Sequence, residues 1–91
     1  IMEIRSREEW GNCRYLRTQM DVEELGTVEI TEVIQYIKED IGEPYEVVVY
    51  SSIVVPKGKI DTEEEKEYYE KKIYEFLDKE LPDRYLVRIF N

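Results

Sequence analysis

The most regular pattern of apolar and polar positions lies in the last third of the chain. Apolar side chains recur there every three or four residues, the period of an α-helix that packs one face on a core. Pro82 cannot continue a helix, so we predict a helix over 62–81. Two overlapping capping boxes precede it, Asp61 with Glu64 and Thr62 with Glu65. Its apolar stripe consists of Tyr69, Ile73, Phe76, Leu77 and Leu81.

A second stripe of apolar residues has the same period in the middle of the chain. It consists of Ile30, Val33, Ile34, Ile37 and Ile41. Gly42 offers a left-handed residue of the kind that ends helices, and Pro44 forbids continuation. Branched aliphatic residues favour a strand, but propensity differences in helices are only about half a kcal/mol per residue. The spacing therefore predicts a helix over about 28–41.

Three segments have the composition of strands. Residues 45–50 are apolar on both faces apart from Glu46, which is typical of a central strand, and residues 84–90 are rich in β-forming side chains. Residues 53–55 either prolong the middle strand past a bend at Ser51 and Ser52 or form a short extra strand. Residues 13–20 supply the first strand. The alternative for that region is a helix, because Ser6 and Glu9 match a capping box.

These elements predict one compact α/β domain over residues 1–91, with residues 1–12 as a peripheral amino-terminal segment. The expected architecture is a small two-layer β-α-β-α-β core, and a ferredoxin-like α+β arrangement is the alternative. The expected core is built from both helical stripes and the middle strand. It contains Val47, Val49, Ile34, Ile37, Ile73, Phe76 and Leu77.

The scarcity of two residue types excludes several chemistries. Cys13 is the single cysteine and the chain has no histidine, so an internal disulfide, a thiolate zinc cluster and a Ser-His or Cys-His nucleophile are all excluded. We expect no cofactor. Carboxylate chemistry with magnesium acting on nucleic acid or phosphate compounds stays as an alternative function, although 22 acidic residues make carboxylate pairs common by chance.

Location and origin follow from composition. No apolar run approaches the roughly 18–20 residues that cross a bilayer, and the amino terminus mixes acids and arginines, so we expect a soluble cytoplasmic protein that does not contact membranes. Abundant Glu and Lys over a β-branched core are typical of thermophilic proteins, which suggests an archaeal or viral source. Biased codon usage explains the same composition.

Charge is distributed unevenly along the chain. Residues 21–44 hold eight acids and one lysine, and the net charge is −9, which disfavours binding to duplex nucleic acid. An acidic helix face would suit a basic protein partner, as in inhibitors that imitate nucleic acid, while solubility explains the acidity equally well. The candidate partner surface is Glu29, Glu32, Glu39, Asp40 and Glu43.

Two further groups are candidate contacts. Arginines beside an aromatic residue suit single-stranded nucleic acid or a protein interface, and the candidate basic-aromatic patch is Arg7, Trp10, Arg14 and Arg17. These side chains form one stripe in a helix, whereas in a strand Arg14 and Arg17 point to opposite faces. The candidate loop contact follows the middle strand and consists of Ser51, Ser52, Lys57 and Lys59. It lacks the first glycine and the hydroxyl of a phosphate-binding loop.

The remaining signal is aromatic. The chain has eight tyrosines, and in the last predicted helix Tyr68 and Tyr74 fall off the apolar stripe, so at least one of them should be partly exposed. Exposed tyrosines favour contact surfaces. Small α/β domains also complete their cores by pairing through a helix face or a sheet edge. We therefore expect a non-enzymatic protein–protein interaction or inhibitor module that forms a homodimer.

Overall fold

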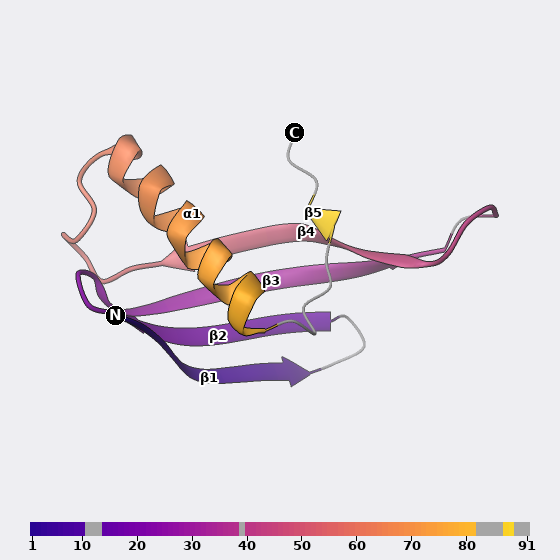
Figure 1. The fold of residues 1–91 in the computed structure, drawn as a ribbon, viewed down its shortest axis with the longest axis horizontal. Helices are drawn as coiled ribbons and strands as arrows, with labels where there is room; N and C mark the ends of the chain where they lie inside the picture. The colour runs from indigo at the N-terminus through magenta and orange to yellow at the C-terminus, as the bar shows by residue number, and fades with distance from the viewer. Residues whose placement is uncertain (11–13, 39, 82–86, 89–91) are drawn as a thin grey trace.

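The computed structural model describes residues 1–10, 14–38, 40–81 and 87–88, which form a five-stranded sheet and one helix (Figure 1). Neighbouring strands in the chain are neighbours in the sheet, in the order β1-β2-β3-β4-β5. The first four strands form an antiparallel meander, and the two-residue β5 pairs in parallel with β4. The elements are β1 (Met2–Trp10), β2 (Arg14–Val22), β3 (Gly26–Ile37), β4 (Tyr45–Val54), α1 (Glu63–Glu80) and β5 (Val87–Arg88).

Helix α1 confirms the helix predicted over 62–81. Thr62 caps it, because its Oγ1 accepts a hydrogen bond from the backbone N–H of Glu65 at 3.1 Å. The helix crosses one face of the sheet diagonally (Figure 1). Its fully buried side chains, Ile73 and Leu77, pack into the main core. The sheet contributes Met20, Val22, Val28 and Ile30 to that core, and Leu25 joins from the turn between β2 and β3.

The second predicted helix, over 28–41, is wrong. Residues 26–37 form strand β3, whose buried side chains are every second residue, from Val28 through Ile30 and Glu32 to Ile34. A spacing of four residues, as between Ile30 and Ile34, occurs in both the helical and the strand pattern. This spacing does not separate the two elements, and the β-branched composition of the segment favours the strand. Gly42 has the expected left-handed φ of 105°, but in the connection between β3 and β4. The β-α-β-α-β core and the ferredoxin-like alternative are not confirmed, since only one helix is present in the described residues.

Strand β2 confirms the expected strand over residues 14–20, and Cys13 lies outside the described residues. The alternative helix beginning near Ser6 is wrong because β1 occupies that segment. Residues 1–12 therefore include a full strand of the sheet. Of the predicted strand over 84–90, Val87 and Arg88 form β5, and the other residues lie outside the described part of the chain.

The expected single core is divided in two. Ile34 packs with Leu16 and Val48 in a second cluster, separate from the residues buried under α1. Val47 is buried, but Val49 is 54% exposed. The reason is a β-bulge, since Ile34 pairs with Val48 and Val33 pairs with Tyr50, leaving Val49 as the extra residue. Residues 51 and 52 continue the ladder with β3, so the strand is irregular at the bulge and not at the serine pair.

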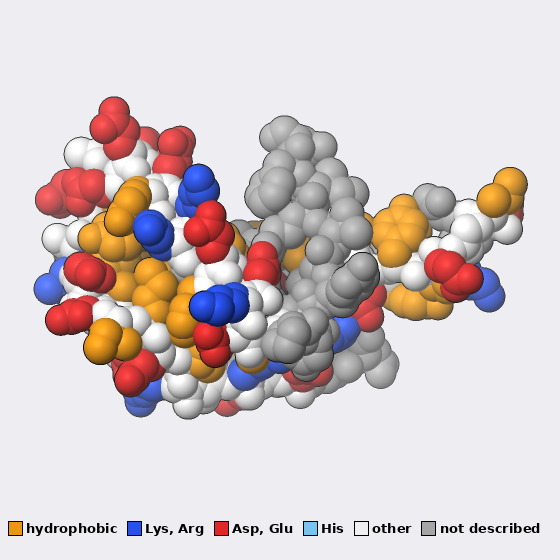
Figure 2. All heavy atoms as spheres, in the orientation of Figure 1, with side chains coloured by type: hydrophobic (Ala, Val, Ile, Leu, Met, Phe, Trp, Pro, Cys, Tyr) orange, Lys and Arg blue, Asp and Glu red, His pale blue; other side chains and the backbone are white. Residues whose placement is uncertain are grey.

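The β3–β4 hairpin extends past the other strands. The pairing of β2 with β3 starts at Ile34, whereas the pairing of β3 with β4 continues to Ile37 and Tyr45. The hairpin therefore projects from the sheet, and the molecule measures 47 × 27 × 21 Å (Figure 1). Hydrophobic side chains are visible on this projection (Figure 2). In the described residues, no helix is long and apolar enough to span a membrane.

Candidate functional site

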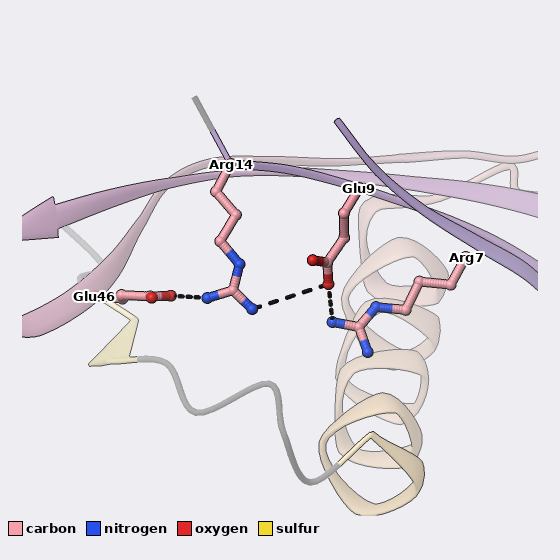
Figure 3. A network of polar contacts seen from close by, with 4 residues as sticks. All are labelled: Arg7, Glu9, Arg14 and Glu46. Atoms are coloured by element: carbon pink, nitrogen blue, oxygen red, sulfur yellow. Dashed lines mark hydrogen bonds and ion pairs between the residues drawn. The ribbon is translucent and has the colours of Figure 1, made fainter. Parts of the chain in front are cut away.

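The amino-terminal arginines do not form the predicted basic-aromatic patch. Arg7 contacts the Glu9 carboxylate at 2.8 Å, and Arg14 lies between Glu9, at 3.9 Å, and Glu46, with which it forms a hydrogen-bonded ion pair (Figure 3). These four side chains come from β1, β2 and β4 and lie on the face of the sheet that also carries α1. Their charges compensate one another, so the network offers no free cationic surface for a phosphate chain.

Arg17 points to the opposite face, where its Nε lies 3.3 Å from Oε1 of Glu29. Arg14 and Arg17 are separated in this way because three residues along a strand reverse the face. The side chain of Trp10 lies outside the described part of the structure. The structure thus brings Arg7 and Arg14 into one network and leaves Arg17 on the other side of the sheet.

The predicted acidic surface is also divided. Glu29 pairs with Arg17, Glu32 is only 1% exposed on the α1 face of the sheet, and Asp40 and Glu43 are exposed in the connection between β3 and β4. Glu39 lies outside the described residues. A common helical face was the premise of this surface, and the strand removes that premise because it alternates its side chains between two faces.

The predicted loop contact is spread over two elements. Ser51 and Ser52 lie within β4, and the Ser51 hydroxyl forms a hydrogen bond with the hydroxyl of Tyr74 on α1. Lys57 and Lys59 are exposed in the turn after β4, where Gly58 has a left-handed φ of 83°. Ser52 points to the other face of the sheet, so these four side chains do not converge on one ligand position.

The outer edge of β4 is the most unusual surface of the described structure. Strand β5 covers this edge at Val47 and Val48 only, and no described strand pairs with it from Val49 onward. The segment 49–55 contains no charged residue and no proline, and Pro56 follows it. Its side chains include three exposed hydrophobic residues, Val49 at 54%, Tyr50 at 56% and Val54 at 63%. Open edges of this composition readily accept another strand.

The two faces of this edge differ. Tyr50 pairs with Val33, and Val54 pairs with Glu29, so both lie on the face away from α1. Ile53 lies on the α1 face and packs against the main core together with Val55. The sequence prediction placed Val49 in the core and Ser51 and Ser52 at a candidate loop contact, and it did not foresee an exposed edge along 49–55. In the sequence this segment is an uncharged run in a chain that is 38% charged, a pattern that a central strand shows as well.

An apolar pocket adjoins the end of β4. It has a volume of about 210 Å³ and lies between the strand end and the first half of α1. Lys66 and Glu70, one helical turn apart on α1, are its charged lining residues. The apolar lining comes from Ile53, Val55, Ile60, Tyr69 and Ile73.

Comparison with protein-family models, curated proteins and solved structures gives no match for this chain. In the part of the chain that the structure describes, no group of three or more Cys, Asp or Glu side chains is placed to hold a metal ion. The edge of β4 and the adjoining pocket are therefore the candidate contact surfaces of the described structure.

Proposed function

We propose that this protein is a non-enzymatic, self-associating interaction module in which two copies pair through the outer edges of their β4 strands. The observation that supports this is the edge over residues 49–55, which carries no charge, pairs with no further strand of the described residues on its outer side and exposes three hydrophobic side chains. Added main-chain hydrogen bonds would satisfy the edge, and the paired side chains would lose exposed apolar area.

Charge favours a second copy as the occupant of this edge. Each chain has a net charge of −9, so most self-contacts would bring acidic surfaces together. Segment 49–55 carries no charge, and pairing it with itself avoids that repulsion. A symmetric pair of identical patches is also the commonest way in which soluble chains associate.

The alternation of side chains limits the register of this pair. In an antiparallel pair, directly opposed side chains lie on the same face, so the two-fold axis must pass through a residue and not between two residues. The open segment runs from Val49, just after the residues that β5 covers, to Val55, just before Pro56. Its midpoint is Ser52. An axis there pairs all seven residues, whereas an axis at Ser51 would need Val48, which β5 already occupies.

This register also matches side chains across the interface. With the axis at Ser52, Tyr50 of one copy lies opposite Val54 of the other, so the two exposed hydrophobic residues of the outer face cover each other twice. Aromatic and β-branched residues in such a pair contribute about 0.2–1 kcal/mol each. The result is a continuous sheet through both copies.

A charge exchange at Ser52 tests the proposal. Because Ser52 faces its own copy across the axis, Ser52→Lys or Ser52→Glu alone places like charges directly opposite each other. We expect the native chain to sediment as a dimer at micromolar concentration and each variant to dissociate at least tenfold more readily. An equimolar mixture of the two variants should form a heterodimer, because unlike charges then meet at the axis.

The matched control for this test lies on the other edge of the sheet. Ser6 is exposed on β1 and shares the outer face with Ser52, so Ser6→Lys adds the same charge away from the interface. It should leave the dimer intact. A native chain that stays monomeric throughout the micromolar range, or a Ser52→Lys variant as dimeric as Ser6→Lys, would contradict the proposal.

A further inference from the structure

The pocket beside the end of β4 is a gap in the outer layer of the main core. Ile73, one of its lining residues, is fully buried in that core. The other apolar lining residues pack against the same core and are only partly buried, and they are Ile53, Val55, Ile60 and Tyr69. All of the lining residues belong to the described part of the chain. The pocket is therefore apolar surface that the fold leaves uncovered.

The volume of the pocket suits one small apolar group. It measures about 210 Å³. An apolar cavity of about 150 Å³ in another protein holds a benzene molecule and no water, whereas drug-sized ligands need pockets of about 300 Å³ or more. A branched aliphatic side chain or a single aromatic ring therefore fits this pocket, and filling it removes apolar area from water on both partners.

Two charged residues line this pocket beside the apolar ones. Lys66 and Glu70 share one face of α1 with Tyr69 and Ile73, since their spacing is three or four residues. Lys66 is exposed and Glu70 is half-buried. Neither side chain forms a hydrogen bond or an ion pair within the part of the chain that the structure describes. A lysine one turn before a glutamate is also the less favourable order for such a pair on a helix. Both charges are therefore available to a ligand.

We infer that this pocket binds a free α-amino acid with a large apolar side chain, such as leucine or phenylalanine. The apolar side chain occupies the pocket, the ligand carboxylate contacts the Lys66 ammonium, and the ligand ammonium contacts the Glu70 carboxylate. An α-amino acid carries both charged groups on the carbon atom that bears its side chain, so one small molecule meets all three requirements. The site lies within one copy of the chain and does not depend on the proposed dimer.

The net charge of the protein favours a zwitterion over a singly charged ligand. At −9, the chain repels an anion at long range. A cation is attracted, but it leaves the Lys66 ammonium beside the bound apolar group without a counter-charge. A zwitterion has no net charge to repel and gives both Lys66 and Glu70 a partner.

Titration of the full chain, followed by NMR chemical shifts, tests the site. L-leucine should bind with a dissociation constant of about 1 mM, which a ligand of about nine non-hydrogen atoms can reach. The largest shifts should fall on the pocket residues, among them Ile60, Tyr69 and Ile73. N-acetyl-L-leucine lacks the ammonium, L-leucinamide lacks the carboxylate, and both keep the side chain. Each should bind about three- to fivefold more weakly than L-leucine, the range of exposed ion pairs.

Two substitutions separate the charged contacts. Lys66→Gln should weaken L-leucine about three- to fivefold and leave L-leucinamide unchanged, because the amide has no carboxylate for Lys66 to bind. Glu70→Gln should weaken L-leucine by a similar factor and leave N-acetyl-L-leucine unchanged. Lys71→Gln and Glu67→Gln are the matched controls, since both residues are exposed on α1 and do not line the pocket. They should change the affinity for L-leucine by less than about 1.5-fold.

A third substitution tests the apolar part, and ligand-free unfolding checks the fold of every variant. Ile60→Phe enlarges a lining side chain and should weaken L-leucine at least as much as the loss of either charge. The unfolding midpoints of the two α1 variants should match that of the native chain. A native chain that binds neither leucine nor phenylalanine at tens of millimolar would overturn the inference. Equal binding of L-leucine and its two derivatives to the native chain and both variants would also overturn it, because the pocket then accepts an apolar group regardless of charge.

Discussion

The two edges of the sheet show opposite solutions to the same problem. Among the described residues, strand β1 pairs on one side only, and it carries Glu3, Arg5 and Glu8 as exposed charged side chains. Both edge strands contain a bulge, so the bulge does not separate them. Strand β4 exposes the other edge, with no charge over 49–55. Exposed charged side chains are one means by which proteins prevent strands from adding to an edge. The comparison indicates that β1 is protected against pairing and β4 is open to it.

The amino-terminal end of β1 is held by polar contacts. The Ile1 ammonium donates a hydrogen bond to the Glu23 carboxylate at 2.7 Å, and the Glu23 N–H donates to the Ile1 carbonyl at 3.2 Å. The ion pair raises the pKa of the ammonium and lowers the pKa of the Glu23 carboxyl. On β4, the Ser51 hydroxyl forms a hydrogen bond with the Tyr74 hydroxyl, so this side chain points to α1 and away from the edge.

Removing the shared core should have the largest effect, because both edges depend on it. Leu77 is the α1 side chain that is fully buried against the sheet together with Ile73, so Leu77→Ala should lower the free energy of unfolding by about 2–5 kcal/mol. Glu75→Ala, on the exposed side of the same helix, should change it by less than about 0.5 kcal/mol. Chemical denaturation at one fixed low concentration measures both, since association would add to apparent stability. Equal small effects would show that α1 does not carry the core.

The sequence prediction is correct where several independent signals agree and wrong where they disagree. For α1, the apolar period, the Thr62 cap and Pro82 all indicated the same helix, and the structure confirms it. For β3, the period and the β-branched composition disagreed. Glu32 made the choice harder, because a charged residue at a core position of the strand hides the alternation of Val28, Ile30 and Ile34. The apolar period alone therefore predicted a helix where the structure has strand β3.

The predicted contact surfaces depended more on whether residues 28–41 form a helix or a strand than on their composition. The acidic set needed a helix to share one face, so the error in β3 removed it. The exposed edge of β4 was not predictable from the same reasoning, because an uncharged run of β-forming residues fits a central strand as well as an open edge. Strand order decides between them, and it depends on pairings between distant segments, which local patterns do not contain.

Neutralising the β1 edge should weaken the contrast between the two edges. The triple variant Glu3→Thr, Arg5→Thr and Glu8→Thr replaces its exposed charges with β-forming side chains. With both edges open, dimers can add further copies, so we expect species larger than a dimer at tens of micromolar in light scattering. A control with Glu64→Gln, Glu67→Gln and Lys71→Gln makes the same change in charge on α1 and should remain dimeric. If the β1 variant also remains dimeric, the exposed charges are not what prevents this edge from pairing.

Salt should produce the smallest effect, and its sign distinguishes the two kinds of partner considered for this chain. Two copies at −9 each repel at long range, while the proposed contact itself is uncharged, so screening favours association. We expect the dimer to tighten by a few-fold between about 50 mM and 200 mM salt. A basic partner attracted to the acidic residues would show the opposite trend, because salt weakens contacts between unlike charges. Sedimentation of the native chain over this range measures the sign directly. A dimer that loosens as salt rises would mean that charged side chains hold it together, and the uncharged edge of β4 would no longer account for the contact.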